Sequence, residues 1–399
     1  MLGSISKVRP CGHHHYYKYA HVKNYQDAYR VEPSKGYNYH SDEYDGVLDF
    51  SFHNVTTSWG TENKGFFDNR YIKKYVISAP SITNCIYMFH PGEYISANII
   101  WQMGFPEQEI ILKDFNWDKI SNVSGFFYAS NLKEIPKSFT PKLIPSTTFN
   151  LFRGCYSLFK LREDGNRYLD YNEYIDKAEG LLAAFYNACN VYGNLKFYFD
   201  TRYKFENVKN INSWCYNIWP FGSSGLQDFT GFSLKNLETA DRAFHGCCGL
   251  KTFSTIDNMT KLTNANDMFA GCYNLTSLYP DKTSFSLPSL TSANRMFGTN
   301  YNGEGYGVGS KLDKPSTLKL CNALPTHTDG AEHLITIGIH IDHKYDPEVN
   351  LALKRVCKSY TTPIEEYGSS LGTTVTGDKG WTLTIQWNGT ATENAYPAP

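Results

Sequence analysis

The sequence predicts a repeat solenoid of short strands and helical turns, with an extended N-terminal arm and a small α+β C-terminal cap. Three observations predict it: a phrase that recurs without gaps, looser copies of that phrase, and two ends that lack it. The 399 residues are long for one compact core, but repeats avoid that limit because each packs only on its neighbours. We expect an arm over 1–60, repeats over 61–300, a glycine-rich linker over 301–330 and the cap over 331–399.

The phrase is clearest in two segments, Asn236–Phe253 and Lys261–Leu278, which align without gaps. Their offset is 25 residues throughout. That period lies inside the window of about 20–29 residues that is typical of leucine-rich repeats. A chance match at this many positions is very improbable, so the prediction is of irregular leucine-rich repeats. The shared positions are Leu237/Leu262, Ala240/Ala265, Phe244/Phe269, Gly246/Gly271, Cys247/Cys272 and Leu250/Leu275.

Other copies are looser, and together they suggest about nine units, most of them irregular. A third copy begins at Leu290 and contains Ala293 and Phe297, then runs into a glycine-rich stretch. Copies closer to the N-terminus contain the same aromatic position but are stretched by insertions. The predicted repeat core consists of Phe127, Phe152, Cys155, Phe185, Leu237, Phe244, Cys247, Leu250, Leu262, Phe269, Cys272, Leu275 and Phe297.

Each unit has a simple physical interpretation. Leu-x-x-Ala-x-x-x-Phe has the spacing of a short helical turn with one buried stripe. The glycine that follows ends this turn, because glycine adopts backbone angles that strain other residues. The next x-x-Leu-x-x-Leu or Phe is expected to be extended and to pair with its counterpart in the neighbouring repeat. Cysteines in register along such a stack indicate small buried core residues rather than disulfide partners, and a chain folded in a reducing cytoplasm.

The Met/Ala-Phe-x-Gly-Cys-x-x-Leu phrase resembles the BspA-type leucine-rich repeats, which occur in gut Bacteroidetes and in their crAss-like phages. The resemblance covers roughly residues 60–300. It implies a right-handed solenoid with irregular convex turns and a role in adhesion or recognition. The family has no catalytic residues that could be carried over to this chain.

The two ends differ from the repeats. Residues 1–60 are rich in Tyr and His and end in Val47–Phe52, a short alternating strand. They form either an anchor on a partner or a loose cap, and both alternatives stay open. In the C-terminal part, isoleucines alternate over 335–341, Asp346-Pro347 begins a helix expected to run to about Tyr360, and Trp381–Trp387 alternates again. This strand, helix and strand would cover the open end of a solenoid. The Gly-Trp-Thr-Leu-Thr-Ile-Gln-Trp-Asn-Gly phrase is similar to C-terminal segments of repeat proteins from gut Bacteroidetes and their phages.

Composition excludes several function classes. The net charge is -1, from 38 basic and 39 acidic residues, so no bulk field attracts nucleic acid. No apolar run is long enough to span a membrane, and the N-terminus lacks the apolar stretch of a secretory signal. Aromatic residues reach 16%, with 30 tyrosines, which suits core packing and binding surfaces alike.

Three segments resemble metal or phosphate sites but favour other interpretations. The His13–His15 run, with Cys11 and His21, lacks a second ligand pair at zinc spacing, so a solvated or partner-facing arm is favoured. The stretch Gly303–Gly309 is not followed by Gly-Lys-Ser/Thr, which favours a flexible loop. An acidic patch lacks the ligand order of a calcium loop, which favours a solvated insertion. Its residues are Glu163, Asp164, Asp170, Glu173 and Asp176. We therefore predict no metal ligands and no cofactor.

The sequence also offers no catalytic residues, because nucleophile, zinc-protease and paired-carboxylate patterns are absent and the cysteines occupy core positions. Variable positions between the core ones carry aromatic residues instead, and aromatic platforms suit sugar rings and protein hot spots. The candidate binding residues are Tyr156, Tyr216, Trp219, Tyr273 and Tyr279.

These observations favour a non-enzymatic virion structural protein of a bacteriophage, a tail or fibre component that serves assembly or host attachment through the solenoid surface. Its expected partners are other virion proteins and a bacterial surface glycan or protein, with no nucleic acid and no membrane insertion. Whether it forms a homo-oligomer stays open. The alternative is a bacterial surface adhesin or glycan-binding leucine-rich repeat protein, which would need an export signal. The expected location is the virion after synthesis in the host cytoplasm, or the bacterial cell surface under the alternative.

Overall fold

The computed structural model divides the chain into two compact units, Met1–Val191 and Tyr192–Pro399. The division falls inside 61–300, the stretch predicted as one repeat region. The predicted His13–His15 segment and most of the glycine-rich loop lie outside the described residues. The structure describes residues 47–51, 74–90, 107–155, 157–186, 188, 196–216, 225–299, 309–360 and 378–389.

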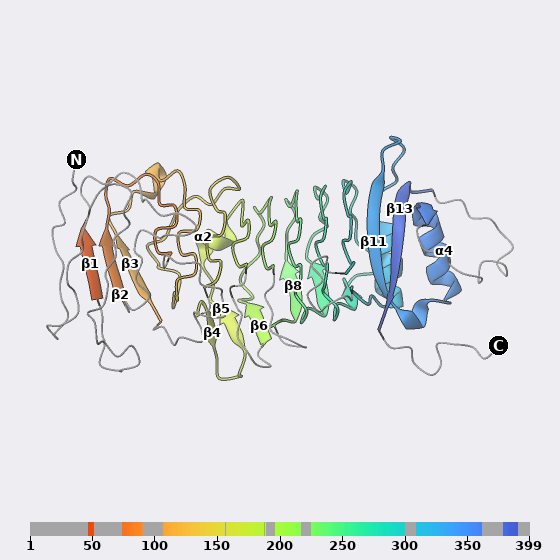
Figure 1. The fold of residues 1–399 in the computed structure, drawn as a ribbon, viewed down its shortest axis with the longest axis horizontal. Helices are drawn as coiled ribbons and strands as arrows, with labels where there is room; N and C mark the ends of the chain where they lie inside the picture. The colour runs from red at the N-terminus through yellow and green to blue at the C-terminus, as the bar shows by residue number, and fades with distance from the viewer. Residues whose placement is uncertain are drawn as a thin grey trace. The chain divides into compact units, whose positions relative to one another are not determined.

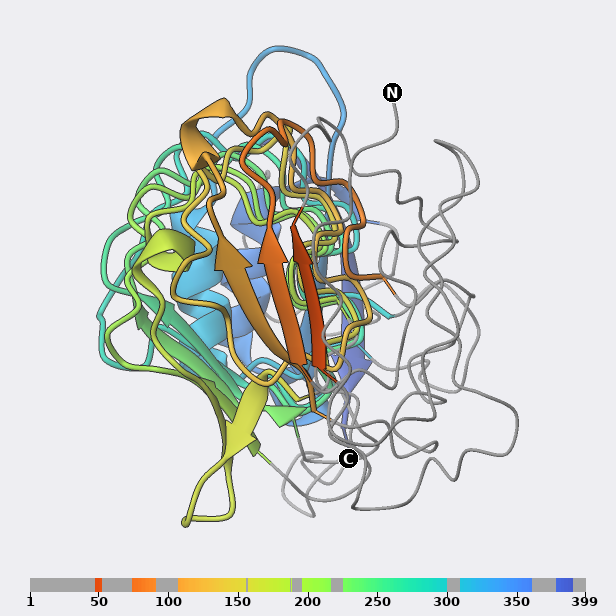
Figure 2. The same cartoon turned by 90° about the vertical axis from the view of Figure 1, so that its left-hand side faces the viewer.

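The first unit begins with a parallel sheet of three strands, which lie side by side in Figure 2. These are β1 (Val47–Ser51), β2 (Lys74–Ser78) and β3 (Glu109–Lys113). The strand predicted at the end of the N-terminal arm is therefore present as β1. Alternating apolar side chains of β3 and the centre of β2 are buried, as expected for strands with one face on a core.

Four short segments of the first unit stack on one another, the first between β2 and β3 and the others after β3: 84–90, 122–130, 147–155 and 181–186. Alternate backbone amides of each segment donate to carbonyls of the next. The amide of Phe127 donates to Leu151 O at 3.1 Å, and the amide of Phe152 donates to Ala184 O at 2.9 Å. The first three segments therefore satisfy alternate amides through the next segment in the stack.

The rest of the first unit is irregular or inserted. A 3-10 turn, η1 (Trp117–Lys119), precedes an antiparallel hairpin of β4 (Phe159–Leu161) and β5 (Arg167–Leu169). The hairpin projects from the unit in Figure 2. The short helix α2 (Glu173–Asp176) follows, with the Asn172 side chain accepting from the amides at its start.

The second unit contains the two aligned phrases. Its stacked segments are 210–216, 239–247, 264–272 and 292–298, joined in the same way by alternate amides and seen as adjacent loops in Figure 1. The predicted extended segments are strands, and Ser277 pairs with Thr252 in parallel at the predicted offset. The strands of this region are β6 (Lys196–Phe199), β7 (Gly225–Leu226), β8 (Asp228–Phe232), β9 (Thr252–Thr255) and β10 (Ser277–Leu278).

The prediction of a helical turn between Leu237 and Phe244 is wrong. The amides of Arg242 and Phe244 donate to Asn266 O and Met268 O of the next segment, at 2.8 and 2.9 Å. Arg242 also has a left-handed φ of 54°, which no right-handed helix contains. The apolar residues are buried all the same, because tight turns repeat the helical spacing over this short distance.

The glycine of the phrase has the left-handed backbone angle that was predicted. Gly154, Gly246 and Gly271 each follow the phenylalanine of the repeated phrase, which we call the ladder phenylalanine, by two residues (Phe152, Phe244 and Phe269), and their φ angles are 73°, 71° and 74°. A side chain would strain each of these positions, which explains why the phrase contains glycine there.

Stacked phenylalanine rings form the core of both units, and all of the predicted repeat-core residues are at most 1% exposed. In the first unit, Phe127 and Phe152 have ring centroids 5.6 Å apart and planes 6° apart. In the second unit, Phe269 stacks on Phe244 at 5.5 Å and on Phe297 at 5.2 Å. Offset stacking at this spacing is favourable for aromatic pairs.

The C-terminal module has the strands and helix that were predicted, in a wholly parallel sheet of order β11-β13-β12. Its sheet adds to the last stacked segment, since Ala293 bridges Ile335 and the Phe297 amide donates to Thr336 O. The helix ends at Val356 rather than near Tyr360, because the next residues pair with β13. The elements are β11 (His333–His340), η2 (Ile341–His343), α4 (Pro347–Val356), β12 (Cys357–Tyr360) and β13 (Trp381–Asn388).

The linker predicted over 301–330 is wrong in part, because α3 (Lys314–Ala323) lies within it. Asp313 caps this helix by accepting from the Ser316 amide at 2.8 Å, and a proline occupies its first turn. The Nζ of Lys379, a residue that precedes β13, donates to carbonyls at the C-terminal end of α3, including Leu324 O at 2.6 Å. Among the described helices, none is long and apolar enough to cross a membrane.

Candidate functional site

Stacking places equivalent side chains of successive segments beside one another. In the first unit, the residue after each ladder phenylalanine belongs to one row, which we call the aromatic row. Its members are His90, Tyr128, Arg153 and Tyr186.

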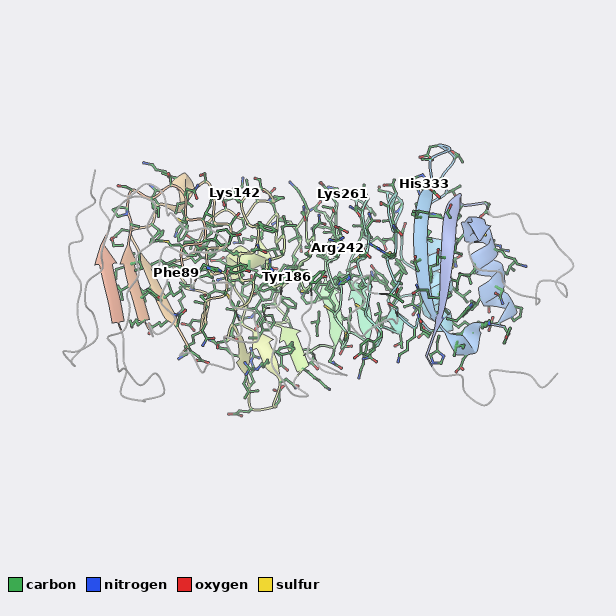
Figure 3. All side chains as sticks on the ribbon, in the orientation of Figure 1. Phe89, Lys142, Tyr186, Arg242, Lys261 and His333 are labelled. Carbon is green, nitrogen blue, oxygen red and sulfur yellow. The ribbon has the colours of Figure 1, made fainter. Side chains whose placement is uncertain are left out.

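Ring and guanidinium groups contact one another along the aromatic row. The rings of His90 and Tyr128 are 4.6 Å apart. The Arg153 guanidinium lies over the Tyr128 ring at 5.3 Å and over the Tyr186 ring at 4.1 Å. Tyr186 is labelled in Figure 3. His90 and Tyr128 are buried while Arg153 and Tyr186 are half-buried, so the row offers a cation held between two aromatic faces.

In the second unit, charged side chains of successive segments form an ionic row: Arg242, Asp267 and Arg295. All three occupy the same left-handed backbone position, with φ between 52° and 54°. Arg295 binds Asp267 through two parallel hydrogen bonds, both 2.8 Å. Arg242 approaches the same carboxylate, with Nε 3.8 Å from Oδ2. The ionic row thus has two cations on one buried anion.

Burial also shifts the pKa values of two groups beside the ionic row, His245 and Asp241. Burial lowers the pKa of His245 to about 4, although Asp267 opposes this, and the ring stacks on Tyr216 at 4.4 Å. Burial likewise raises the pKa of Asp241 above its usual value. A neutral histidine on a tyrosine therefore lies beside the paired arginines at neutral pH.

Arg242 is the outermost charge of this arrangement. Its side chain is 51% exposed, whereas that of Asp267 is 5% exposed and that of Arg295 is 32% exposed. Figure 3 labels Arg242 on the second unit. A guanidinium held at one edge by a buried carboxylate keeps its other N–H groups for an anionic partner, such as a carboxylate or a phosphate. The arrangement is therefore suited to binding an anionic group.

The structure describes three of the five predicted aromatic binding residues, Tyr216, Tyr273 and Tyr279. Tyr156 and Trp219 lie outside the described residues. Tyr216 is half-buried and stacks on His245, and Tyr273 is half-buried and hydrogen-bonds to Cys248.

The prediction that Tyr279 is a surface binding residue is wrong. Its ring is 1% exposed, stacks on Phe285 at 4.1 Å, and shares a hydrogen bond of 2.9 Å with Thr255 Oγ1. Burial raises the pKa of the phenol well above its usual value. Tyr279 follows β10 directly and packs inward against β9, so it stabilises the core.

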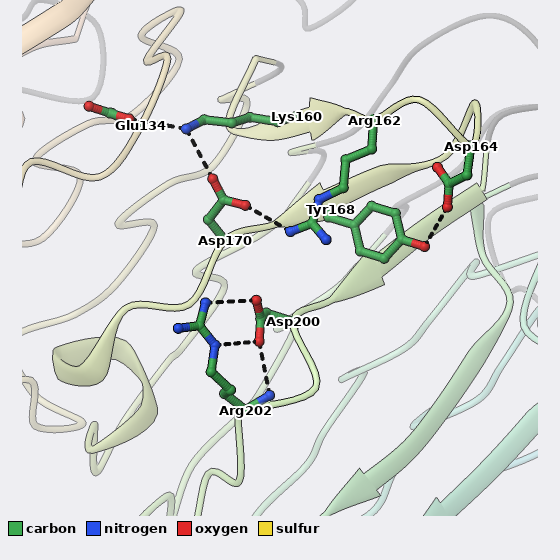
Figure 4. A network of polar contacts seen from close by, with 8 residues as sticks. All are labelled: Glu134, Lys160, Arg162, Asp164, Tyr168, Asp170, Asp200 and Arg202. Carbon is green, nitrogen blue, oxygen red and sulfur yellow. Dashed lines mark hydrogen bonds and ion pairs between the residues drawn. The ribbon is translucent and has the colours of Figure 1, made fainter.

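Carboxylates of the acidic patch have separate partners on and near the β4–β5 hairpin, and Figure 4 shows those of Asp164 and Asp170. Asp170 binds Lys160 and Arg162, each at 3.0 Å. Asp164 accepts from the Tyr168 hydroxyl at 2.8 Å, and Glu173 pairs with Lys177 at 3.1 Å. These oxygens therefore face cations and hydroxyls of the protein rather than a common point.

The cysteines of the repeated phrase donate across the stack. The thiols of Cys155, Cys247 and Cys272 lie 2.8, 3.0 and 3.0 Å from backbone carbonyls of the preceding segment. Burial raises the pKa of Cys155 to about 12 and that of Cys272 well above its usual value. A thiol with a raised pKa is a poor nucleophile, which agrees with a structural role.

Sequence reasoning missed the ionic row, although a signal was present. The aligned copies read Ala-Asp-Arg, Ala-Asn-Asp and Ala-Asn-Arg from Ala240, Ala265 and Ala293, so opposite charges alternate at one position. It also missed His327, Asp329 and His333 of the C-terminal module, the group among the described residues that could hold a metal ion. No protein family, no curated protein and no solved structure matches this chain.

Proposed function

We propose that the stacked segments are turns of a leucine-rich-type solenoid, and that the chain belongs with the BspA-type repeats that its phrase resembles. Support comes from the parallel pairing of β9 and β10 at the repeat offset and from the stacked rings at the equivalent Phe244 and Phe269. Side chains at one position of such a solenoid act as a row, because neighbouring turns share their orientation.

On this architecture the chain is a non-enzymatic structural protein of a bacteriophage virion, a tail or fibre component that serves assembly or host attachment. The single observation that carries the binding role is the ionic row. Arg295 and Asp267 form a bidentate ion pair, and the half-exposed Arg242 lies 3.8 Å from the same carboxylate. The assignment to a virion rests on the resemblance of the repeat phrase.

The chemistry of the ionic row favours an anionic partner. Arg242 offers a guanidinium, and the stacked pair of Tyr216 and His245 offers an aromatic face beside it. Acidic side chains of another virion protein fit this pair of features, and so do acidic sugars of a bacterial surface.

Quantitative mass spectrometry of purified phage particles tests this function. The expected result is a fixed number of chains per particle that survives repeated density-gradient purification. The chain in the host envelope fraction and not in the particles would contradict the proposal and favour the adhesin alternative.

A further inference from the structure

The loop between α3 and β11 brings three metal-binding side chain types together. The ligand atoms of His327, Asp329 and His333 all lie within 4.8 Å of one another. The loop packs on Trp381 at the start of β13, whose ring centroid is 4.8 Å from that of His327. It also reaches the last stacked segment of the second unit, through His333 and the carbonyl of Thr291.

His333 has a fixed orientation and a fixed tautomer. The residue is 5% exposed, and its Nδ1 lies 2.8 Å from Thr291 O. A carbonyl only accepts, so Nδ1 carries the hydrogen. In a neutral ring, Nε2 then presents a lone pair to Asp329, whose two oxygens are 3.0 and 3.2 Å away. Two acceptors at this distance repel each other unless a cation, either a proton or a metal ion, lies between them.

His327 adds a second nitrogen to this place. Its Nε2 is buried and has no hydrogen-bond partner among the described residues. The ring stacks on His333, with centroids 3.6 Å apart. A buried nitrogen without a partner is costly, so a ligand there would stabilise the loop.

We propose that His327, Asp329 and His333 bind one divalent transition-metal ion of the zinc class. Two imidazoles and one carboxylate are donors that zinc commonly takes, with a further position left for water or a partner group. The hydrogen bond from His333 Nδ1 to a backbone carbonyl is the outer contact that orients metal-binding histidines. The ion would cross-link the loop between α3 and β11 to the first residue of β11.

Closure on the ion needs a small rearrangement. Imidazoles bind metals in the ring plane, and the planes of His327 and His333 are stacked 13° from parallel. His333 is held by Thr291 O and is buried, whereas His327 is half-buried, so His327 gives up its backbone hydrogen bond to Leu290 and turns out of the stack. The Asp329 side chain is 57% exposed and adjusts at little cost. His333 is therefore the fixed ligand, and the other two close on the ion.

The test measures Zn²⁺ retained by the full chain after dialysis, and the visible spectrum of the Co²⁺ form. His13, His14 and His15 are replaced by Gln in every sample, because that run can bind ions by itself. Asp329→Asn is the main variant, since the side chain is 57% exposed and an amide oxygen can still accept from the Ala331 amide, and His333→Gln is the second. His343→Gln is the matched control, a histidine of the same module outside the cluster.

The expected result is one Zn²⁺ per parent chain and per His343→Gln chain, with affinity lowered about 10–100-fold or more in Asp329→Asn. Zn²⁺ should also raise the melting temperature of the parent and of His343→Gln, but not that of Asp329→Asn. No Zn²⁺ on the parent chain would overturn the proposal. Equal retention by Asp329→Asn and His343→Gln would overturn it as well, since the metal would then bind elsewhere.

Discussion

Single residues in left-handed conformation determine where each stacked segment turns. Arg242, Asp267 and Arg295 have this conformation without being glycine, which costs each of them about 1 kcal/mol. The ion pairs of the ionic row offset part of that cost. Their opposite charges could have been predicted by comparing aligned copies, but the burial of Asp267 could not, because it depends on the path of the backbone between segments.

The pH dependence of stability should depend on His245. Its folded pKa of about 4 lies below the ordinary value of 6.5, so the unfolded chain binds more protons between these values. The stabilising contribution of the neutral ring is complete above pH 6.5 and is lost as the pH falls towards 4. Replacing His245 with Phe keeps a ring against Tyr216 and removes the titration.

Urea unfolding of both proteins across this pH range measures the effect. The wild-type chain should lose about 2–3 kcal/mol relative to His245→Phe between neutral pH and the acidic end. A difference that stays constant with pH would mean that His245 is not buried as a neutral ring.

Individual strands and helices show which parts of the fold are readable from sequence. The pairing of β9 with β10 followed from the offset between two copies, and α4 followed from Asp346 and Pro347. The turn after Leu237 was mistaken for a helix because its apolar spacing suits both structures. Only hydrogen bonds to the next segment separate them, and such bonds are not local in sequence.

Helix α3 was missed for a different reason. Its cap residue Asp313 and its proline were visible, but half of its ten residues are polar, and no apolar stripe marks them as a helix. Tertiary pairing also overrides the local helix preference after Val356, because Cys357–Tyr360 pair with β13 and form β12.

The ladder of stacked rings should dominate the stability of the second unit. Replacing Phe269 with Ala removes a ring that is 1% exposed and contacts Phe244 and Phe297, so unfolding free energy should fall by about 3–5 kcal/mol. Ile256→Ala, at a side chain that is 50% exposed, is the control and should cost less than about 1 kcal/mol. Equal melting temperatures for the two variants would contradict a buried ladder.

Over the chain as a whole, function is proposed to come from rows of side chains that several segments supply together. Removing the exposed charge of the ionic row should weaken partner binding without loss of fold. Arg242→Gln should enter phage particles less efficiently, or give particles that adsorb to host cells more slowly, than the wild-type chain. The physical reason is the loss of a positioned guanidinium for an anionic partner.

The matched control is Lys261→Gln, which removes one positive charge from an exposed position of the same unit outside the ionic row. Particle composition and adsorption rate are the measurements. If both variants behave alike, the ionic row has no specific partner and net charge alone matters.

The stacking of the repeated phrase supports every later step, and hydrogen exchange at single-residue resolution tests it most directly. The amides of Arg242, Phe244, Asp267 and Phe269 donate to the next segment, so they should be strongly protected. They should also lose protection together in the Phe269→Ala variant, because each segment is held by its neighbours. Exchange at the rate of an unstructured peptide over Asn236–Leu278 would contradict the stacked arrangement and the rows built on it.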